Sequence, residues 1–351
     1  IGMFKKAWWN ILTALAVVFI KIFRKGKKNK EEEFSLEKIK NILIIRLDGV
    51  GDLILSVPVF ENIKRNLKDV KLAALVREYN KGVLTGNPYI DEIKVYKGIK
   101  DLLILKKDNY DLAIDLTYDF NLKSAIACYL SNAKFKGGYK GKNSNAFYNL
   151  QIDRDIEPKY EVKKNLNMIK TLGIKANIEK PRLYPDEKDF NAVKEYFKKN
   201  EMNENDVLIG FNPGTKRKFH RWQTEKYSSL GKILIQKHNA KIIITWGPCE
   251  ENMARKIVQS IGNRGCFMAM PPDIQTRAAL MKSLKVFVCG DTGPIHIAMA
   301  MDIPVVGLYG EGDYASKRWL PDNYEKLEII KGKTCKHIEV NDVLLGIEKY
   351  L

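Results

Sequence analysis

The sequence has little of what marks a secreted disulfide protein, a zinc protein or a membrane-spanning protein. Only five of its 351 residues are cysteines, and no two of them form a Cys-x-x-Cys pair. A chain this long does not depend on a disulfide scaffold, and no zinc-ligand spacing is present, so we expect buried cysteines in a reducing compartment. The mostly apolar run at residues 8–20 has 13 residues, whereas a membrane-spanning helix needs about 20.

Acidic residues are scarce relative to basic ones. The chain has 60 Lys and Arg against 42 Asp and Glu, a formal net charge of +18 at pH 7. Such a charge predicts attraction to nucleic acid, an anionic membrane or phosphorylated substrates. The first 30 residues carry +8 of this charge and no acidic residue. This concentration argues against a uniformly basic nucleic-acid-binding protein, so we expect no nucleic-acid partner.

The first thirty residues have the pattern of an amphipathic helix. Aromatic and aliphatic residues lie largely opposite a polar and basic face, which comprises Lys6, Asn10, Thr13, Lys21, Arg24 and Lys28. This pattern is typical of a helix in the headgroup layer of an anionic membrane, here over residues 4–28. A short signal anchor, or a helix packed on its own protein or on a partner, are the alternatives. We assign residues 1–33 to this helix and a charged linker.

From residue 40 onward, short apolar runs rich in β-branched residues alternate with glycine turns and helical patterns. Strands are predicted at 41–46, 71–76, 112–116, 207–211, 241–245, 286–289 and 304–308, with helices at 56–67, 224–238, 250–261 and 295–301. A less regular stretch at 131–165 suits a substrate-facing surface. The alternation predicts two doubly wound α/β domains facing each other across a cleft, at 40–180 and 186–336, with a linker at 179–185. Residues 337–351 are predicted to form a helix that packs back on the first domain.

The first motif that could carry chemistry follows the first predicted strand, in the loop Arg46-Leu47-Asp48-Gly49-Val50-Gly51-Asp52. The loop lacks the third glycine of the dinucleotide-binding pattern, and Val76 is followed by Arg77 rather than by an acid, so we expect no nicotinamide cofactor. It does offer two carboxylates, Asp48 and Asp52, either of which could deprotonate an acceptor hydroxyl. Alternatively, Asp52 only caps the helix that follows.

The second motif is the turn Gly290-Asp291-Thr292-Gly293, between a strand and a helix whose first turn contains Pro294. The free backbone N–H groups of Thr292, Gly293 and the first helical turn favour an anion, as does the helix dipole. The glycines admit a diphosphate close to the backbone. His296, one turn into the helix, either donates to that phosphate or is a satisfied core histidine.

Taken together, RLDGVGDLILSVP and CGDTGPIHIAMAMDIPVVGLYG resemble segments of the ADP-heptose:lipopolysaccharide heptosyltransferases, glycosyltransferase family 9. The resemblance covers roughly residues 41–345, and the two motifs together are far more specific than either alone. It implies the GT-B fold, in which two Rossmann-like domains face each other. In that fold the acceptor binds to the N-terminal domain and the sugar nucleotide to the C-terminal one.

The resemblance also implies roles for individual residues. The catalytic base falls on Asp52, and the acceptor-side residues are Arg46, Asp48, Gly51 and Asp115. The donor and its diphosphate fall on Asp291, Thr292, Gly293, His296, Thr215, Gly247 and Glu250. Where the family usually reads Lys-Arg-Trp-Pro, this chain has His220-Arg221-Trp222-Gln223. His220 thus replaces a phosphate-binding lysine, and Lys216, Arg217, Lys218 and Arg221 are alternative sources of positive charge.

The motifs and the resemblance together predict an inverting, metal-independent glycosyltransferase without a cofactor. By resemblance, it moves heptose from ADP-heptose to a hydroxyl of a lipopolysaccharide core or related glycolipid. We expect a cytoplasmic protein, peripheral on the inner face of the cytoplasmic membrane. One alternative is a GT-B-fold nucleotide-sugar epimerase or hydrolase, which needs no membrane helix. Another is a non-catalytic membrane-bound nucleotide-sugar binder, which has no use for Asp52.

Overall fold

The computed structural model describes residues 33–154, 160–203, 205–215, 220–247, 249–262, 265–269, 271–311, 318–321 and 324–351. The predicted amphipathic helix at 4–28 falls outside these ranges, as do Lys216, Arg217 and Lys218. Within them, no helix has the length and apolar character needed to cross a bilayer.

Two six-stranded parallel sheets form the framework. The first has the order β3-β2-β1-β4-β5-β6, with strands β1 (Asn41–Ile45), β2 (Lys71–Arg77), β3 (Glu92–Tyr96), β4 (Leu112–Asp115), β5 (Phe135–Tyr139) and β6 (Leu150–Ile152). The second has the order β12-β11-β10-β7-β8-β9, with strands β7 (Leu208–Asn212), β8 (Lys241–Ile244), β9 (Cys266–Met268), β10 (Val286–Gly290), β11 (Val305–Gly310) and β12 (Leu327–Gly332). The predicted pair of doubly wound α/β domains is confirmed.

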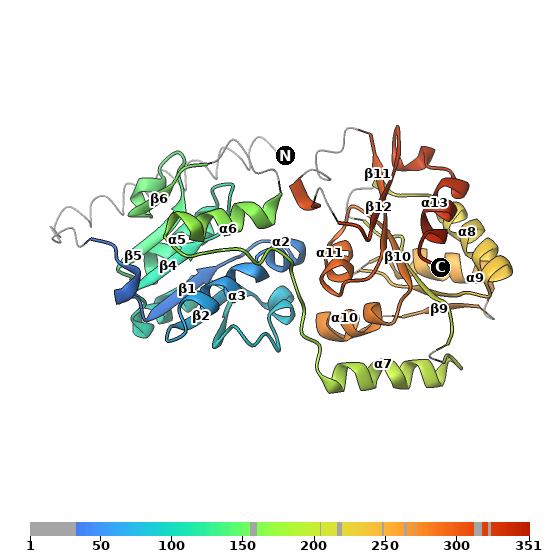
Figure 1. Ribbon diagram of the computed structural model, residues 1–351, viewed down its shortest axis with the longest axis horizontal. Coiled ribbons are helices and arrows are strands. Elements are labelled where there is room, and N and C mark those ends of the chain that lie inside the picture. The colour runs from blue at the N-terminus through green and yellow to red at the C-terminus, as the bar shows by residue number, and fades with distance from the viewer. Residues whose placement is uncertain are drawn as a thin grey trace.

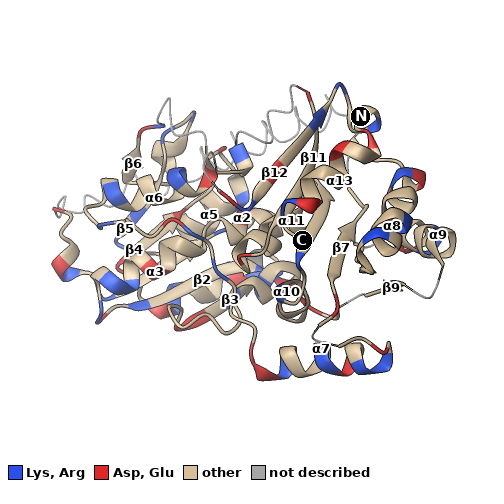
Figure 2. Ribbon diagram, turned by 45° about the vertical axis from the view of Figure 1, so that its right-hand side comes forward, with Lys and Arg blue, Asp and Glu red and all other residues tan. Residues whose placement is uncertain are grey.

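Helices cover both faces of each sheet and form two lobes side by side (Figure 1). The helices on the first sheet are α2 (Val50–Ile54), α3 (Val57–Asn66), α4 (Ile99–Ile104), α5 (Leu122–Leu130) and α6 (Glu161–Thr171). The second lobe has α7 (Glu187–Lys199), α8 (Thr224–His238), α9 (Glu251–Ile261), α10 (Ile274–Lys282), α11 (Gly293–Ala300) and α13 (Val340–Glu348). Basic and acidic residues are interspersed along α7 (Figure 2), whereas α8 has one acid in its first turn and basic residues in its last.

Burial on both faces explains why the central strands read as continuous apolar runs. In β1, Ile42 and Ile44 join the core on one side of the sheet, while Leu43 and Ile45 join the core on the other. A parallel sheet covered by helices on both sides requires such strands. The stretch 131–165, which we expected to be irregular, instead contains β5, β6 and the start of α6.

The prediction that the C-terminal helix packs on the first domain is wrong. Helix α13 contacts α8, β11 and β12 of the second domain. Its Val343 and Ile347 are buried in the same core as Trp222, whose indole N–H donates to the carbonyl of Ile338 at 2.9 Å. The short connection from Gly332 to Val340 keeps the helix on the sheet to which β12 belongs.

Two helical contacts join the lobes. Helix α2 of the first domain packs on α11 of the second (Figure 1). The 3-10 helix η2 (Glu78–Val83), which follows β2, packs on α10. At this second contact the Gln275 amide donates to the carbonyls of Gly82 at 2.7 Å and Thr85 at 2.9 Å. The carboxyl ends of β1 and β10 therefore face each other across the domain boundary.

Candidate functional site

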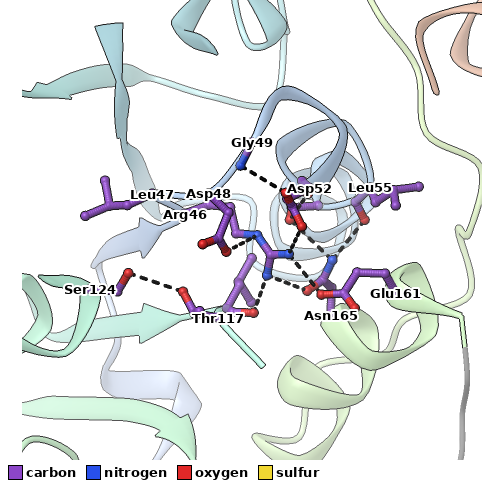
Figure 3. Close-up of polar contacts among 12 residues, drawn as sticks. Arg46, Leu47, Asp48, Gly49, Asp52, Leu55, Thr117, Ser124, Glu161 and Asn165 are labelled. Atoms are coloured by element: carbon purple, nitrogen blue, oxygen red, sulfur yellow. Dashed lines mark hydrogen bonds and ion pairs between the residues drawn. The ribbon is translucent and has the colours of Figure 1, made fainter. Parts of the chain in front are cut away.

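A buried arginine organises the loop that follows β1. Arg46 is 1% exposed, and its guanidinium lies among three carboxylates (Figure 3). Nη2 lies 2.9 Å from Glu161 and 3.4 Å from Asp52, and Nε lies 3.4 Å from Asp48. Nη1 donates to the carbonyl of Leu116, at the end of β4. Burial opposes the positive charge, but the carboxylates outweigh it and raise the pKa of Arg46, so the guanidinium stays charged.

Asp52 is both a cap and a candidate base. One carboxylate oxygen accepts the Gly49 N–H at 2.9 Å and closes the first turn of α2, as the capping alternative predicted. The other oxygen faces Arg46, and the side chain keeps 24% of its surface exposed. Burial raises the pKa of Asp52, Arg46 works against this shift, and Asp48 adds to it. A partly accessible carboxylate with a raised pKa is suited to accept a proton.

Two residues of α6 that the sequence analysis missed complete this site. The Glu161 carboxylate is fully buried against Arg46. One helical turn later, the side-chain oxygen Oδ1 of Asn165 accepts a hydrogen bond from Arg46 Nη1 at 3.3 Å. Burial would raise the pKa of Glu161, but Arg46 and Arg318 outweigh it and lower the pKa. Glu161 lies 115 residues after Arg46. No local sequence pattern marks this pair. The one signal that could have found it is that a buried arginine requires an acidic partner.

Asp115 is part of the interior of the first domain. Its side chain is 1% exposed, and its oxygens accept from the Tyr148 hydroxyl at 2.6 Å and from the Thr117 N–H at 2.9 Å. Burial raises the pKa of Asp115 to about 6, against the effect of these hydrogen bonds. The structure therefore places Asp115 in the interior, with Tyr148 as a hydrogen-bond partner.

The turn after β10 lies directly opposite the loop after β1. Thr292 precedes α11 in an extended conformation, and Gly293 starts the helix. A Cβ added to Gly51 would stand 2.6 Å from Cδ2 of His296, so the imidazole touches the backbone of α2. His296 is 6% exposed and its Nδ1 has no hydrogen-bond partner among the described residues. Burial lowers its pKa to about 4, so the ring is neutral at pH 7.

The loop after β7 approaches the same turn. Thr215 Oγ1 lies 3.5 Å from the Asp291 carbonyl, and the Thr215 carbonyl accepts two hydrogen bonds from the Arg221 guanidinium, at 3.1 and 2.9 Å. The backbone carbonyl of His220 lies 3.4 Å from the position of a Cβ on Gly290. These contacts bring the predicted donor-side residues together around the switch point between β7 and β10. The other predicted cations, Lys216, Arg217 and Lys218, lie outside the described residues.

Glu250 connects the loops after β7 and β8. Its carboxylate accepts the Gly247 N–H at 2.8 Å and lies over Gly214, where an added Cβ would stand 1.8 Å from Oε2. Nearby, Arg277 donates to the Trp246 carbonyl at 3.2 Å. Because parallel strands of this fold bind ligands beyond their carboxyl ends, this edge is suited to bind part of a ligand.

The arrangement can support acid–base chemistry on one side and anion binding on the other. The first domain presents a carboxylate beside a fixed cation, and the second presents backbone donors at a helix N-terminus. Among the described residues, no group of three or more His, Cys, Asp or Glu side chains forms a metal-binding cluster.

Comparisons of the sequence and of the fold with known proteins lead to the same family. A profile of glycosyltransferase family 9 (heptosyltransferase) matches residues 103–340. Lipopolysaccharide heptosyltransferase 1 from Campylobacter coli is 26% identical over 295 residues, which cover 77% of this chain and 83% of the relative. The crystal structure of a family 9 glycosyl transferase from Veillonella parvula has a TM-score of 0.81 at 19% identity, covering 89% of this chain and 97% of that one. An Escherichia coli heptosyltransferase with ADP-2-deoxy-2-fluoro heptose has a TM-score of 0.71 at 19% identity, covering 89% and 100%.

Proposed function

The chain belongs to glycosyltransferase family 9, and we propose that it transfers heptose from ADP-heptose to a hydroxyl of a lipopolysaccharide core or related glycolipid. The substrates are inferred from relatives, which include a lipopolysaccharide heptosyltransferase and a heptosyltransferase with an ADP-heptose analogue. The observation that carries the proposal is the placement of Asp52 beside Arg46, directly across the domain boundary from the turn that begins α11.

In the proposed reaction Asp52 removes the proton of the acceptor hydroxyl. The acceptor oxygen attacks the anomeric carbon from the face opposite the nucleoside diphosphate, so the new C–O bond forms as the bond to the β-phosphate oxygen breaks. One displacement of this kind inverts the configuration at the anomeric carbon. The raised pKa of Asp52 strengthens it as a base while Arg46 keeps an ionised fraction available.

Negative charge develops on the β-phosphate of the leaving group. Backbone N–H groups at Thr292, Gly293 and the first turn of α11 are fixed before the reaction, so they can stabilise this charge without reorganisation. Arg221, held against the Thr215 carbonyl, lies on the adjacent loop and can add a positive charge. These groups account for leaving-group stabilisation without a metal ion, so we propose a metal-independent reaction.

We also propose that the enzyme works at an anionic membrane surface, where a lipid-linked acceptor resides. The basic, aromatic segment 4–28 is the first support for this location. A second support lies in the folded first domain, where α4 exposes Leu103 and Ile104 beside the exposed Lys106 and Lys107. Adjacent apolar and basic side chains are suited to an interface of headgroups and acyl chains.

Product analysis tests the proposed function. Purified full-length protein is incubated with ADP-heptose and lipopolysaccharide acceptors that lack core heptose, with and without EDTA. We expect mass spectrometry to show an acceptor carrying an added heptose, NMR to show inverted anomeric configuration, and EDTA to have no effect. Release of free sugar, or conversion of the donor without an acceptor, would instead indicate a hydrolase or an epimerase. The Asp52→Asn variant controls for contaminating activity.

A further inference from the structure

One carboxylate of the first domain holds an arginine from each domain. Glu161 Oε1 lies 2.9 Å from Arg46 Nη2, and Glu161 Oε2 lies 3.1 Å from Arg318 Nε. Arg46 follows β1 of the first sheet, whereas Arg318 lies between β11 and β12 of the second. The Glu161 side chain is 0% exposed, so neither oxygen has water as an alternative partner.

Arg318 makes further contacts that fix its guanidinium at the domain boundary. Its Nη1 lies 3.0 Å from Asp119 of the first domain, and its guanidinium carbon lies 4.6 Å from the centre of the Trp319 ring. With 23% of the side chain exposed, this contact is at the edge of the interface. It is therefore a contact that is lost when the two domains separate.

A second residue of α6, Asn165, also contacts Arg46. Asn165 accepts from Arg46 Nη1 and donates from Nδ2 to the Leu55 carbonyl at 3.0 Å, just after α2 ends (Figure 3). Residues four apart share one face of a helix, so Glu161 and Asn165 present two acceptors to a single guanidinium. The arginine in turn contacts Asp48 and Asp52.

From these contacts we infer that Glu161 and Arg318 are positioning residues for Asp52. When the two domains come together, Arg318 binds the Glu161 carboxylate, and this contact changes the net charge around the base. With Arg318 in contact, the charge of Glu161 is divided between two guanidinium groups, and Arg46 stays attracted to Asp48 and Asp52. Without Arg318, Glu161 is neutralised by Arg46 and Lys164 alone. The inference rests on the proposed role of Asp52 as the base.

Several charged or titratable groups surround Asp52, some beside it and others linked to it through one of its neighbours. They are Arg46 and Asp48 in the loop after β1, Tyr79 of η2, Glu161 and Lys164 of α6, the neutral His296 of α11, and Arg318. Removing the Arg318 charge makes this group more negative by one unit, which disfavours ionisation of Asp52. Removing the Glu161 charge has the opposite sign.

The test is the pH dependence of kcat/KM in full-length protein, measured with ADP-heptose and a lipid-linked acceptor. We expect Arg318→Gln to move the acidic limb up by roughly half a unit to one unit, and Glu161→Gln to move it down. The double variant should return the limb toward the wild-type position, and Arg318→Lys should restore it in part. Lys180→Gln is the control, because it breaks a different ion pair between distant segments, the exposed pair Lys180–Asp302 at 2.5 Å, and should leave the limb unchanged.

The outcomes separate this inference from the proposed function. If Asp52→Asn keeps wild-type turnover, the proposed base is wrong. If Asp52→Asn is inactive but Arg318→Gln leaves the acidic limb in place, or changes only the KM for the acceptor, the inference is overturned and Arg318 is a substrate or packing contact. Equal shifts in Arg318→Gln and Lys180→Gln also overturn it. Should Glu161→Gln fail to fold, the two Arg318 variants decide the question, because Arg318 is partly exposed.

Discussion

The two domains use different means at the carboxyl ends of two central strands, β1 and β10. At the carboxyl end of β1, a buried arginine is surrounded by carboxylates from the β1 loop and from α6, and by a backbone carbonyl at the end of β4. At the carboxyl end of β10, glycines and a helix N-terminus offer backbone donors from one short segment. We refer to these as the charged site (Arg46, Asp48, Asp52, Glu161) and the backbone site (residues 290–293 and His296).

The difference follows from what each site has to do. A base needs a carboxylate whose proton affinity is adjusted by neighbours, and buried charges require partners that only a folded chain supplies. A diphosphate site needs fixed donors and close approach, which a glycine turn and a helix supply locally. Variants in the two sites should therefore differ in the size and kind of their effects.

The largest effect is expected in the charged site. Replacing Asp52 with Asn removes the proposed base but keeps the shape of the side chain, so kcat should fall by about 10²–10⁴-fold with ADP affinity unchanged. Steady-state kinetics and calorimetry with ADP measure the two quantities. Asp91→Asn is the control, because Asp91 is paired with Lys64 away from the site. A greater loss in Asp48→Asn than in Asp52→Asn would assign the base to the other carboxylate.

The contributions of Asp115 and His296 to the free energy of unfolding should change with pH in opposite directions. The pKa of Asp115 is raised to about 6, so its contribution to the free energy of unfolding is present below about pH 4 and is lost as pH rises through 6. The pKa of His296 is lowered to about 4, so its contribution is present above about pH 6.5 and is lost as pH falls through 4. Each accounts for about 3 kcal/mol.

Urea unfolding from pH 4 to 7 measures these contributions. Relative to wild type, Asp115→Asn should gain stability as pH rises, and His296→Gln should gain stability as pH falls. Parallel slopes for the two variants would contradict the opposite environments of these residues.

The contact between the two sites depends on Gly51. In Gly51→Ala the new methyl group would stand 2.6 Å from the imidazole of His296, so either the buried imidazole or the two helices must shift. Overpacking of this kind costs about 1–3 kcal/mol, and we expect kcat/KM to fall by about tenfold to a hundredfold. Gly98→Ala is the matched control at a helix start, because nothing lies within 4 Å of the added Cβ. An unchanged kcat/KM in Gly51→Ala would show that this contact is not needed for catalysis.

The smallest effect is expected in the backbone site. His296→Gln removes one neutral hydrogen-bonding group next to donors that belong to the main chain, so ADP should bind about three- to tenfold more weakly. Calorimetry with ADP checks this value against His238→Gln, which alters a surface histidine paired with Glu348. An ADP affinity equal to wild type would assign His296 to packing on Gly51 alone.

Local sequence patterns predicted the backbone site and much of the framework. The helix predicted at 224–238 is α8, and the strand predicted at 241–245 is β8 with its last residue in the following loop. The turn before α11 was placed correctly because glycines and Pro294 mark it within a few residues. The strands β5 and β6 were missed, because β5 contains two adjacent glycines and β6 is a three-residue strand at the edge of the sheet.

The sequence by itself determined the fold class and the positions of the two glycine-containing loops, because periodicity and glycine turns are local properties, and the resemblance of its two motifs indicated the family. Only the tertiary structure decided that Glu161 neutralises Arg46, that Arg318 joins them from the other domain, that Asp115 is buried with Tyr148 and that α13 stays on the second sheet. Each of these depends on segments far apart in the chain, and the cost of burying a charge selects its partner only once folding has brought the segments together.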